Sequence, residues 1–369
     1  MKELKIVVPN NFREFGKKVD LHIKELRGGK DDSFIVKADF IRFNNGEGKV
    51  VINETLRDKD LYILSDVSNH GVSYQYYGNT HYMSPDEHFK DIKSILAAEC
   101  GHAAKRTVIM PYLYGCRQDK KETREPLDCA IALQELERLR VNEIVTCDVH
   151  NRAVMNAVPT MAFESMPVND VLMLDLLSHE EIDDFTNVIF VSPDEGAIKR
   201  SRLYSDLLGE SDFAFFHKHR DPLNIVDGHN PVDEHRFSGS REDISGKCVI
   251  ISDDMIDTGG SIIDAAKKLK KLGASKIYLM ATFAFFSKGI TKFDECYQDG
   301  IINRVYATNL GYVPTEIQNK EWFRLSDCSL KIAELINRLN YGRSVGDLIE
   351  CKTETAIKIR RLKRINEIK

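Results

Sequence analysis

Several features are missing from this sequence, and each absence excludes a class of protein. Its eight cysteines include no CxxC pair, which argues against a zinc ribbon and against a disulfide scaffold. No run of about 20 apolar residues occurs, so we expect no membrane span and no membrane partner. The first residues, MKELKIVVPNN, lack the apolar core of a signal peptide. Together these absences favour a cytoplasmic protein in a reducing environment.

The chain also lacks a large excess of acidic over basic residues, or the reverse. The formal net charge is only −5 over 369 residues, which gives no indication of a nucleic-acid partner. Low-complexity segments and obvious internal repeats are absent as well. What the chain does contain is 42% hydrophobic residues, enough for sizeable cores, and its length predicts two domains.

Short apolar runs alternate with amphipathic segments along most of the chain. Helical stripes are expected over 88–100 and 128–139. Runs typical of buried strands occur at 4–8, 61–64, 107–110, 143–147, 188–191 and 277–281. This alternation predicts an α/β fold, in which mostly parallel sheets are flanked by helices.

The stretch 247–263, KCVIISDDMIDTGGSII, gives the strongest functional signal. A buried strand is expected over 248–251, followed at once by acidic residues, a glycine-rich turn and a helix that stops near Gly273. The glycines let backbone N–H groups approach an anion, and the helix N-terminus adds positive charge. Carboxylates suit sugar hydroxyls or a Mg²⁺ ion. The pattern therefore predicts a sugar-phosphate site rather than a plain capped turn. Its members are Asp253, Asp254, Asp257, Thr258, Gly259, Gly260 and Ser261.

A second candidate site follows the strand at 107–110. The sequence PYLYGCRQDKK places a dense cationic cluster at the carboxyl edge of a sheet, where α/β proteins bind ligands. Arg117 can clamp phosphates or stack on a base, and Gln118 can bind adenine. The alternative is a solvated basic loop.

Three further strand ends carry polar residues. After 143–147, Asp148 and His150 share one face. A lone histidine is usually a structural residue, but this D-x-H pair at the end of a strand indicates a Mg²⁺ site. After 188–191, Asp194 precedes a glycine and a basic helix start, which could cradle a diphosphate; an N-capped helix is the alternative. In FAFFHKHRD, Lys218 and Arg220 could close over a phosphoryl group, unless they form only a basic strand edge.

Other segments leave alternatives open. The turn at 43–47 could bind adenine or ribose through Asn45 and Glu47, although by itself it reads as a hairpin turn without a ligand. The tyrosine-rich segment 65–88 reads as an extended surface loop, either a lid, a subunit contact or an inert insertion. The polar segment after Arg220 looks mobile. In the basic tail, Ile357, Leu362 and Ile365 favour a solvated or subunit-packing helix over one that binds membranes or nucleic acid.

Taken in order, FNNGE, PYLYGCRQDKK with TREP, CDVHN, SPDEGAIKRSR, KHR and SDDMIDTGGS resemble the ribose-phosphate pyrophosphokinase family over about 4–348. The resemblance implies two phosphoribosyltransferase-like domains, 1–165 and 166–345, and a basic tail, 346–369. It also implies transfer of the β,γ-diphosphoryl group of ATP to the 1-hydroxyl of ribose 5-phosphate. A simple phosphoribosyltransferase would share only the sugar-phosphate loop. A catalytically silent regulatory homologue is disfavoured because Lys218 and Arg220 are retained.

The resemblance also implies roles for individual residues. Lys218 and Arg220 are expected to be catalytic. His150 and Asp194 are expected to hold Mg²⁺, together with Asp148 of the D-x-H pattern. ATP is expected to bind Asn45, Glu47, Arg117 and Gln118, the first two from a neighbouring subunit. Ribose 5-phosphate is expected to bind Arg220, Asp253, Asp254, Asp257, Thr258, Gly259, Gly260 and Ser261. At least a dimer, and by family a hexamer, is therefore expected.

The sequence departs from the family pattern at several places. The segments 65–88 and 221–245 and the tail are longer than is usual in the family. Single substitutions are Asn45 for Asp, Lys120 for Arg, Ala197 for Gly, Ser261 for Thr and Phe283 for His. Because the acids of the sugar-phosphate loop and Lys218 are present, we expect the departures to affect regulation by phosphate and ADP, and assembly, rather than the chemistry.

Overall fold

The computed structural model describes residues 2–29, 32–121, 123–182, 184–194, 196–209, 212–220, 232–238, 240, 242–351, 357–362 and 364. For Lys199, 218–220 and 232–236 it describes the backbone only. The chain forms two compact units. Unit 1 comprises 1–167, 309–312 and 327–350, and unit 2 comprises 168–308, 313–326 and 351–369.

Unit 1 is built on a five-stranded parallel sheet with the strand order β1-β4-β7-β8-β9. Unit 1 also contains two antiparallel hairpins, β2–β3 and β5–β6, each of which is a separate two-stranded sheet. Its elements are β1 (Leu4–Val7), η1 (Asn10–Phe12), α1 (Arg13–Leu26), β2 (Ala38–Arg42), β3 (Gly48–Ile52), β4 (Asp60–Leu64), β5 (Ser73–Tyr76), β6 (Asn79–Tyr82), α2 (Pro85–Ala98), β7 (Lys105–Ile109), α3 (Asp128–Arg138), β8 (Glu143–Cys147), η2 (Arg152–Ala157), β9 (Ala162–Met166), α9 (Ser329–Asn340) and α10 (Gly346–Ile349).

Unit 2 is built on a seven-stranded sheet with the order β12-β11-β10-β13-β14-β15-β16, parallel except for the β11–β12 pair. Its elements are α4 (Asn169–His179), η3 (Phe185–Asn187), β10 (Val188–Ser192), α5 (Ile198–Leu208), β11 (Asp212–Arg220), β12 (Val232–Phe237), β13 (Cys248–Ile256), α6 (Gly260–Lys271), β14 (Lys276–Ala284), α7 (Thr291–Gln298), β15 (Arg304–Thr308), α8 (Thr315–Gln318) and β16 (Phe323–Ser326).

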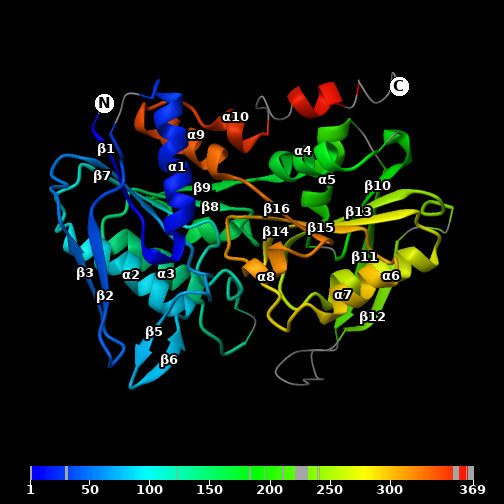
Figure 1. Ribbon diagram of the computed structural model, residues 1–369, viewed down its shortest axis with the longest axis horizontal. Helices are drawn as coiled ribbons and strands as arrows, with labels where there is room; N and C mark the ends of the chain where they lie inside the picture. The colour runs from blue at the N-terminus through cyan, green and yellow to red at the C-terminus, as the bar shows by residue number, and fades with distance from the viewer. Residues whose placement is uncertain are drawn as a thin grey trace. The chain divides into compact units, whose positions relative to one another are not determined.

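Helices cover both faces of each sheet. In Figure 1, α1 and α9 lie on one side of the unit 1 sheet and α2 and α3 on the other, while α4 and α5 face α6 and α7 across the unit 2 sheet. Because both faces are covered, central strands such as β4 and β8 are buried along their whole length. The expected α/β class with parallel sheets is confirmed.

The two units do not follow the chain in two contiguous halves. The boundary near 165 expected from the sequence lies close to the break at 167, but 327–345, expected in the second domain, pack in unit 1. The reason is that α9 packs against α1. Arg27, just after α1, connects the C-terminal ends of α1 and α9. Its Nε donates to Asn337 Oδ1 (2.9 Å) and its Nη2 donates to Asn340 Oδ1 (2.8 Å).

Three local expectations need correction. The strand expected over 248–251 continues to Ile256, because β13 keeps its register with β14 through Met255, which is paired with Phe283. The segment 65–88 contains the β5–β6 hairpin rather than an extended loop. The polar segment after Arg220 includes β12, paired with β11, while its residues 221–231 lie outside the described ones.

In the basic tail, residues 357–362 are helical. Ile357 is 48% exposed, whereas Ile359 is buried, and Ile365 lies outside the described residues. Within the part of the chain that the structure describes, no helix combines the length and the apolarity needed to cross a bilayer.

Candidate functional site

The turn between β13 and α6 is held in place by the core beneath it. Gly259 has φ +75°, a conformation that side chains with a Cβ adopt only with strain. Phe285 N–H donates to Ile256 O over 2.8 Å, and Ser287 N–H donates to Asp257 O over 2.9 Å. Ser287 Oγ also donates to the Asp257 carboxylate. The turn Thr258–Ser261 thus leads into a helix whose N-terminal amides suit a phosphate.

Acidic side chains gather beside this turn. Asp254, 5% exposed, lies next to Asp253 on β13, and its N–H donates to Asp253 Oδ1 over 2.8 Å. Burial raises the pKa of Asp253 well above its usual value, the charges of Asp254 and Asp194 raise it further, and Arg200 lowers it. The structure therefore brings Asp194 and Arg200 into the electrostatic surroundings of Asp253. A ligand that offers hydroxyl donors or a cation would relieve the repulsion among these acids.

The loop that carries Asp194 is fixed relative to β13. Asp194 Oδ1 accepts a hydrogen bond from Ala197 N–H over 3.2 Å, which shapes the entry into α5. One turn into the helix, Ser201 Oγ lies 2.7 Å from Ser252 Oγ, and both serines are fully buried. Since β10 and β13 are neighbouring parallel strands, Asp194 with the start of α5 and the 253–261 segment share the carboxyl edge of the sheet.

Lys218 and Arg220 lie at the end of β11, which pairs in parallel with β10. Their backbone therefore reaches the same carboxyl edge. The register with β12 shifts between His219 and Arg220, and such a bulge redirects the strand where it occurs. The side chains of Lys218 and Arg220 lie outside the described part of the structure.

The remaining predicted residues lie in unit 1, on neighbouring strand ends. Arg117 and Gln118 follow β7, and Asp148 and His150 follow β8, its parallel neighbour. Pro111 O connects the ends of β7 and β8, since it accepts hydrogen bonds from Cys147 N–H and from Thr146 Oγ1, both over 2.9 Å.

Two details of this edge concern ligand binding. Asp148 has φ +41°, a conformation that is strained for a non-glycine residue and that concentrates at functional sites. Gln118 Nε2 donates to Pro126 O over 3.2 Å and Gln118 N–H donates to Gly115 O over 2.8 Å, so this residue shapes its own loop. Arg117, by contrast, is exposed.

Asn45 and Glu47 lie at the exposed tip of the β2–β3 hairpin. They hydrogen-bond each other, from Asn45 Nδ2 to Glu47 Oε2 (3.1 Å) and from Glu47 N–H to Asn45 Oδ1 (3.2 Å). Gly46 between them has φ +91°. The two side chains are thus presented together on one tight turn.

Among the described residues, no three metal-binding side chains form a ready-made metal site. Asp194 lies in unit 2, whereas Asp148 and His150 lie in unit 1. The oxygen-rich surroundings of Asp253 nevertheless suit a hard cation.

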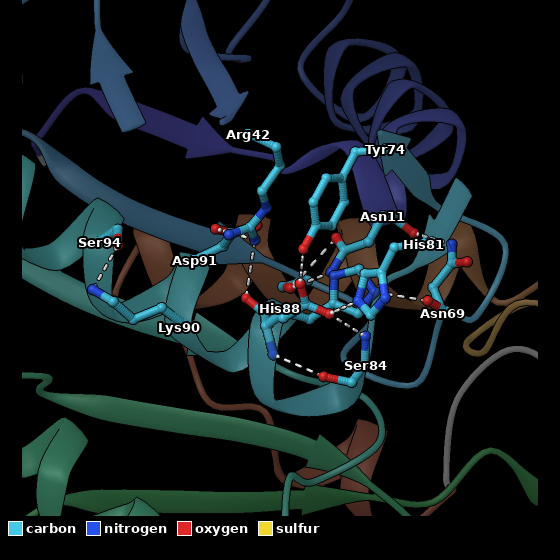
Figure 2. A network of polar contacts seen from close by, with 12 residues as sticks. Asn11, Arg42, Asn69, Tyr74, His81, Ser84, His88, Lys90, Asp91 and Ser94 are labelled. Carbon is cyan, nitrogen blue, oxygen red and sulfur yellow. Dashed lines mark hydrogen bonds and ion pairs between the residues drawn. The ribbon is translucent and has the colours of Figure 1, made fainter. Parts of the chain in front are cut away.

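One group of residues near the Asn45 turn was missed from the sequence. It joins the β2–β3 hairpin, the β5–β6 hairpin and the start of α2, and Figure 2 shows its polar contacts. Two sequence signals could have found part of it. Ser84-Pro85 with Glu87 has the spacing of a capping box, which forms here. Tyr77-Gly78, both with positive φ, is typical of a tight hairpin turn.

Comparison with known proteins gives a consistent result over most of the chain. Residues 4–139 match the family model described as the N-terminal domain of ribose phosphate pyrophosphokinase. Residues 239–350 match the model described as the phosphoribosyl synthetase-associated domain. The chain is 28% identical to a ribose-phosphate pyrophosphokinase of Pasteurella multocida over 82% of its length and 88% of the relative. It is 26% identical to one of Haemophilus influenzae over 94% and 98%.

The fold has a counterpart among solved structures. The phosphoribosylpyrophosphate synthetase from Mycobacterium smegmatis matches with a TM-score of 0.74 and 23% identity, covering 92% of this chain and 100% of that one.

Proposed function

Because this chain belongs to the ribose-phosphate pyrophosphokinase family, we propose that it is a ribose-phosphate diphosphokinase that acts in nucleotide biosynthesis in the cytoplasm. The 1-hydroxyl oxygen of D-ribose 5-phosphate attacks the β-phosphorus of ATP. A new bond forms between these atoms, and the bond from the β-phosphorus to the oxygen that bridges to the α-phosphorus breaks. The hydroxyl proton is released to solvent, and the products are 5-phosphoribosyl 1-diphosphate and AMP.

One observation supports this reaction above the others: Asp194 with the start of α5 and the 253–261 segment occupy one sheet edge in unit 2. The glycine turn and the N-terminus of α6 suit the 5-phosphate of the sugar. Asp253 and Asp254 suit its ribose hydroxyls. Arg200 and the start of α5 suit the diphosphate that is transferred.

The positive charge that the reaction needs is also located at this edge of the sheet. Lys218 and Arg220 stand at the end of β11, which neighbours β10 and is separated from β13 by that strand. Diphosphoryl transfer depends mainly on positioning and on neutralising the negative charge that develops. We assign Lys218 to stabilise the bridging oxygen that leaves with AMP, and Arg220 to hold the sugar phosphate and the transferred group.

Mg²⁺ is the cofactor we propose. The acids around Asp194 fit it, because carboxylate oxygens are its preferred protein ligands and their mutual repulsion favours a cation. Asp194 in unit 2, and Asp148 and His150 in unit 1, are the residues that we propose as Mg²⁺ ligands. The ion, when bound, neutralises phosphate charge.

For ATP we propose Arg117 and Gln118 from one subunit, with Asn45 and Glu47 from another. The exposed hairpin tip that carries Asn45 and Glu47 supports this division, because such a tip can reach outward to a second copy of the chain. The enzyme would then be at least a dimer, and by family a hexamer.

The direct experiment is to incubate the purified chain with ATP, Mg²⁺ and ribose 5-phosphate and to separate the nucleotides. AMP and 5-phosphoribosyl 1-diphosphate should form in equal amounts, and only when ribose 5-phosphate is present. Formation of ADP in place of AMP would refute the proposal. Failure to bind ATP at all would favour a phosphoribosyltransferase.

A further inference from the structure

The β5–β6 hairpin lies directly against the turn 43–47. Tyr77 N–H donates to Asn44 O over 3.0 Å. Gly46, at φ +91°, faces two tyrosines of β5: a Cβ there would lie 3.0 Å from a ring carbon of Tyr76 and 3.3 Å from the Oη of Tyr74. The turn that presents Asn45 and Glu47 therefore has one side supported by backbone and aromatic contacts.

The hairpin is itself fixed to the start of α2 through Glu87. Tyr74 Oη donates to Glu87 Oε1 over 2.7 Å, and His81 Nε2 lies 2.9 Å from Glu87 Oε2. The same Oε2 accepts from Ser84 N–H over 2.8 Å. Figure 2 shows Tyr74, His81 and Ser84 converging from β5, β6 and the start of α2. One carboxylate thus holds both strands of the hairpin to the helix.

A second connection fixes the base of the turn. Arg42, the last residue of β2, forms an ion pair with Asp91 of α2 over 2.7 Å, and these side chains are only 11% and 9% exposed. Arg42 Nη2 also donates to Glu87 O over 3.2 Å. Gly48, opposite Arg42 on β3, leaves room for the guanidinium, since a Cβ at Gly48 would lie 2.1 Å from Nη1.

The charge of Glu87 suits this role. Burial raises its pKa, but the hydrogen bonds from Ser84 N–H, His81 and Tyr74 outweigh burial and lower the pKa to about 2. Glu87 is therefore a carboxylate throughout the neutral range, and an ionised acceptor makes stronger hydrogen bonds than a neutral one.

We propose that the β5–β6 hairpin is a brace that orders the turn 43–47 before ATP binds, with Tyr74, His81 and Glu87 as positioning residues. This inference rests on the proposed function, in which Asn45 and Glu47 contact ATP. A turn that is already ordered loses less conformational entropy when it binds its ligand. The brace should therefore strengthen ATP binding equally in the ground and transition states, which changes KM and leaves kcat alone.

The test compares two Tyr→Phe variants of the same hairpin. Tyr74→Phe removes the hydrogen bond to Glu87, whereas Tyr82→Phe alters a phenol that is 62% exposed. We expect Tyr74→Phe to raise the KM for ATP about tenfold, the equivalent of about 1.4 kcal/mol. Its kcat and its KM for ribose 5-phosphate should stay within about twofold of wild type. Tyr82→Phe should match wild type in all three constants.

A second readout does not depend on activity. Amide hydrogen exchange of 43–47 should be faster in Tyr74→Phe than in Tyr82→Phe, while exchange in the β4 and β8 strands stays unchanged. Equal exchange of the turn in the two variants, or equal KM values for ATP, would overturn the brace. A parallel fall in kcat with a rise in both KM values would also overturn it, because that pattern indicates general damage. Failure of the proposed function would show instead in wild type, as absence of AMP.

Discussion

Gly259 lies so close to the ring of Phe293 that a Cβ on Gly259 would stand 2.5 Å from both Cε2 and Cζ of that ring. Phe293 cannot move aside easily, because it is fully buried and stacks on Trp322 with the ring centroids 5.6 Å apart. The shape of the turn Thr258–Ser261 is therefore set by the core of unit 2. Close packing of this kind transmits any change in volume to the turn above it.

Alanine at Gly259 should be much more harmful than alanine at a glycine of similar φ. Gly289 has φ +77° but nothing within 4 Å of a Cβ, so Gly289→Ala should cost only about 1–2 kcal/mol of backbone strain. Gly259→Ala adds overpacking against Phe293, about 1–3 kcal/mol more. Urea unfolding of both variants checks this, and KM for ribose 5-phosphate should rise only for Gly259→Ala. Equal losses would mean that the ring contact is not a constraint.

Asp253→Asn should stabilise the substrate-free protein while it impairs the enzyme. Burial, with Asp254 and Asp194, raises the pKa of Asp253, so keeping it ionised in the folded state costs free energy as the pH rises. Removing that charge should raise the free energy of unfolding by about 1 kcal/mol at about pH 8 and by less at about pH 5. Activity should fall about a hundredfold.

Asp264→Asn, at an exposed position of α6, is the control for the Asp253 variant and should change neither stability nor activity. Denaturant titrations at the two pH values and steady-state rates supply the measurement. A destabilised Asp253→Asn protein would show that the acids do not repel each other in the folded state.

Removing Arg42 should destabilise unit 1 in a pH-dependent way. Burial raises the pKa of Asp91 to about 6, although Arg42 acts to lower it. The stability contributed by protonated Asp91 is therefore present below about pH 4 and is lost as the pH rises through about 6. In Arg42→Met the buried carboxylate loses its partner, which should cost about 3–5 kcal/mol at about pH 8 and less at about pH 5.

The double variant Arg42→Met with Asp91→Leu should recover much of that loss, because no unpaired charge stays buried. Thermal or urea unfolding at both pH values distinguishes these cases. A loss of the same size at the two pH values would speak against the buried carboxylate as its cause.

Lys218→Ala should lower kcat about a hundred- to a thousandfold and leave KM for both substrates nearly unchanged. The reason is that its charge is expected to count mainly in the transition state. Lys218→Arg should rescue only partly, since a planar guanidinium does not replace a compact ammonium. Lys288→Ala, at an exposed position of unit 2, is the matched control. Normal kcat with weakened ATP binding by calorimetry would make Lys218 an anchor for the ground state instead.

The parallel core was predictable because buried strands are written as short apolar runs. The strand at 143–147 was expected with the bounds that β8 has. The end of β13 was not, since Asp253 and Asp254 are strand residues whose place depends on pairing with β14. Polar residues at the carboxyl end of a strand indicate a site, but they also interrupt the apolar run from which the end of the strand is predicted.

Contacts between segments far apart in the chain could not be predicted from the sequence. Strand β5 is mostly exposed, so it lacks the apolar alternation that marks a half-buried strand, and its support of Gly46 is a tertiary contact. In the same way, nothing in the pattern of α9 indicates that its partner is α1. For the candidate site, the individual strand ends were predictable, while the electrostatic coupling of Asp194 and Arg200 to Asp253 required the fold.

The return of α9 to α1 has a consequence for how the protein is made. Helix α1 ends at Leu26 and α9 begins at Ser329, and ribosomes add about 5–20 residues per second. Unit 1 must therefore wait roughly 15 to 60 s for α9 while the whole central sheet of unit 2 is synthesised. A chain that terminates before Ser329 would carry α1 without its packing partner. The crossing of the chain thus makes completion of unit 1 depend on the prior synthesis of the unit 2 sheet.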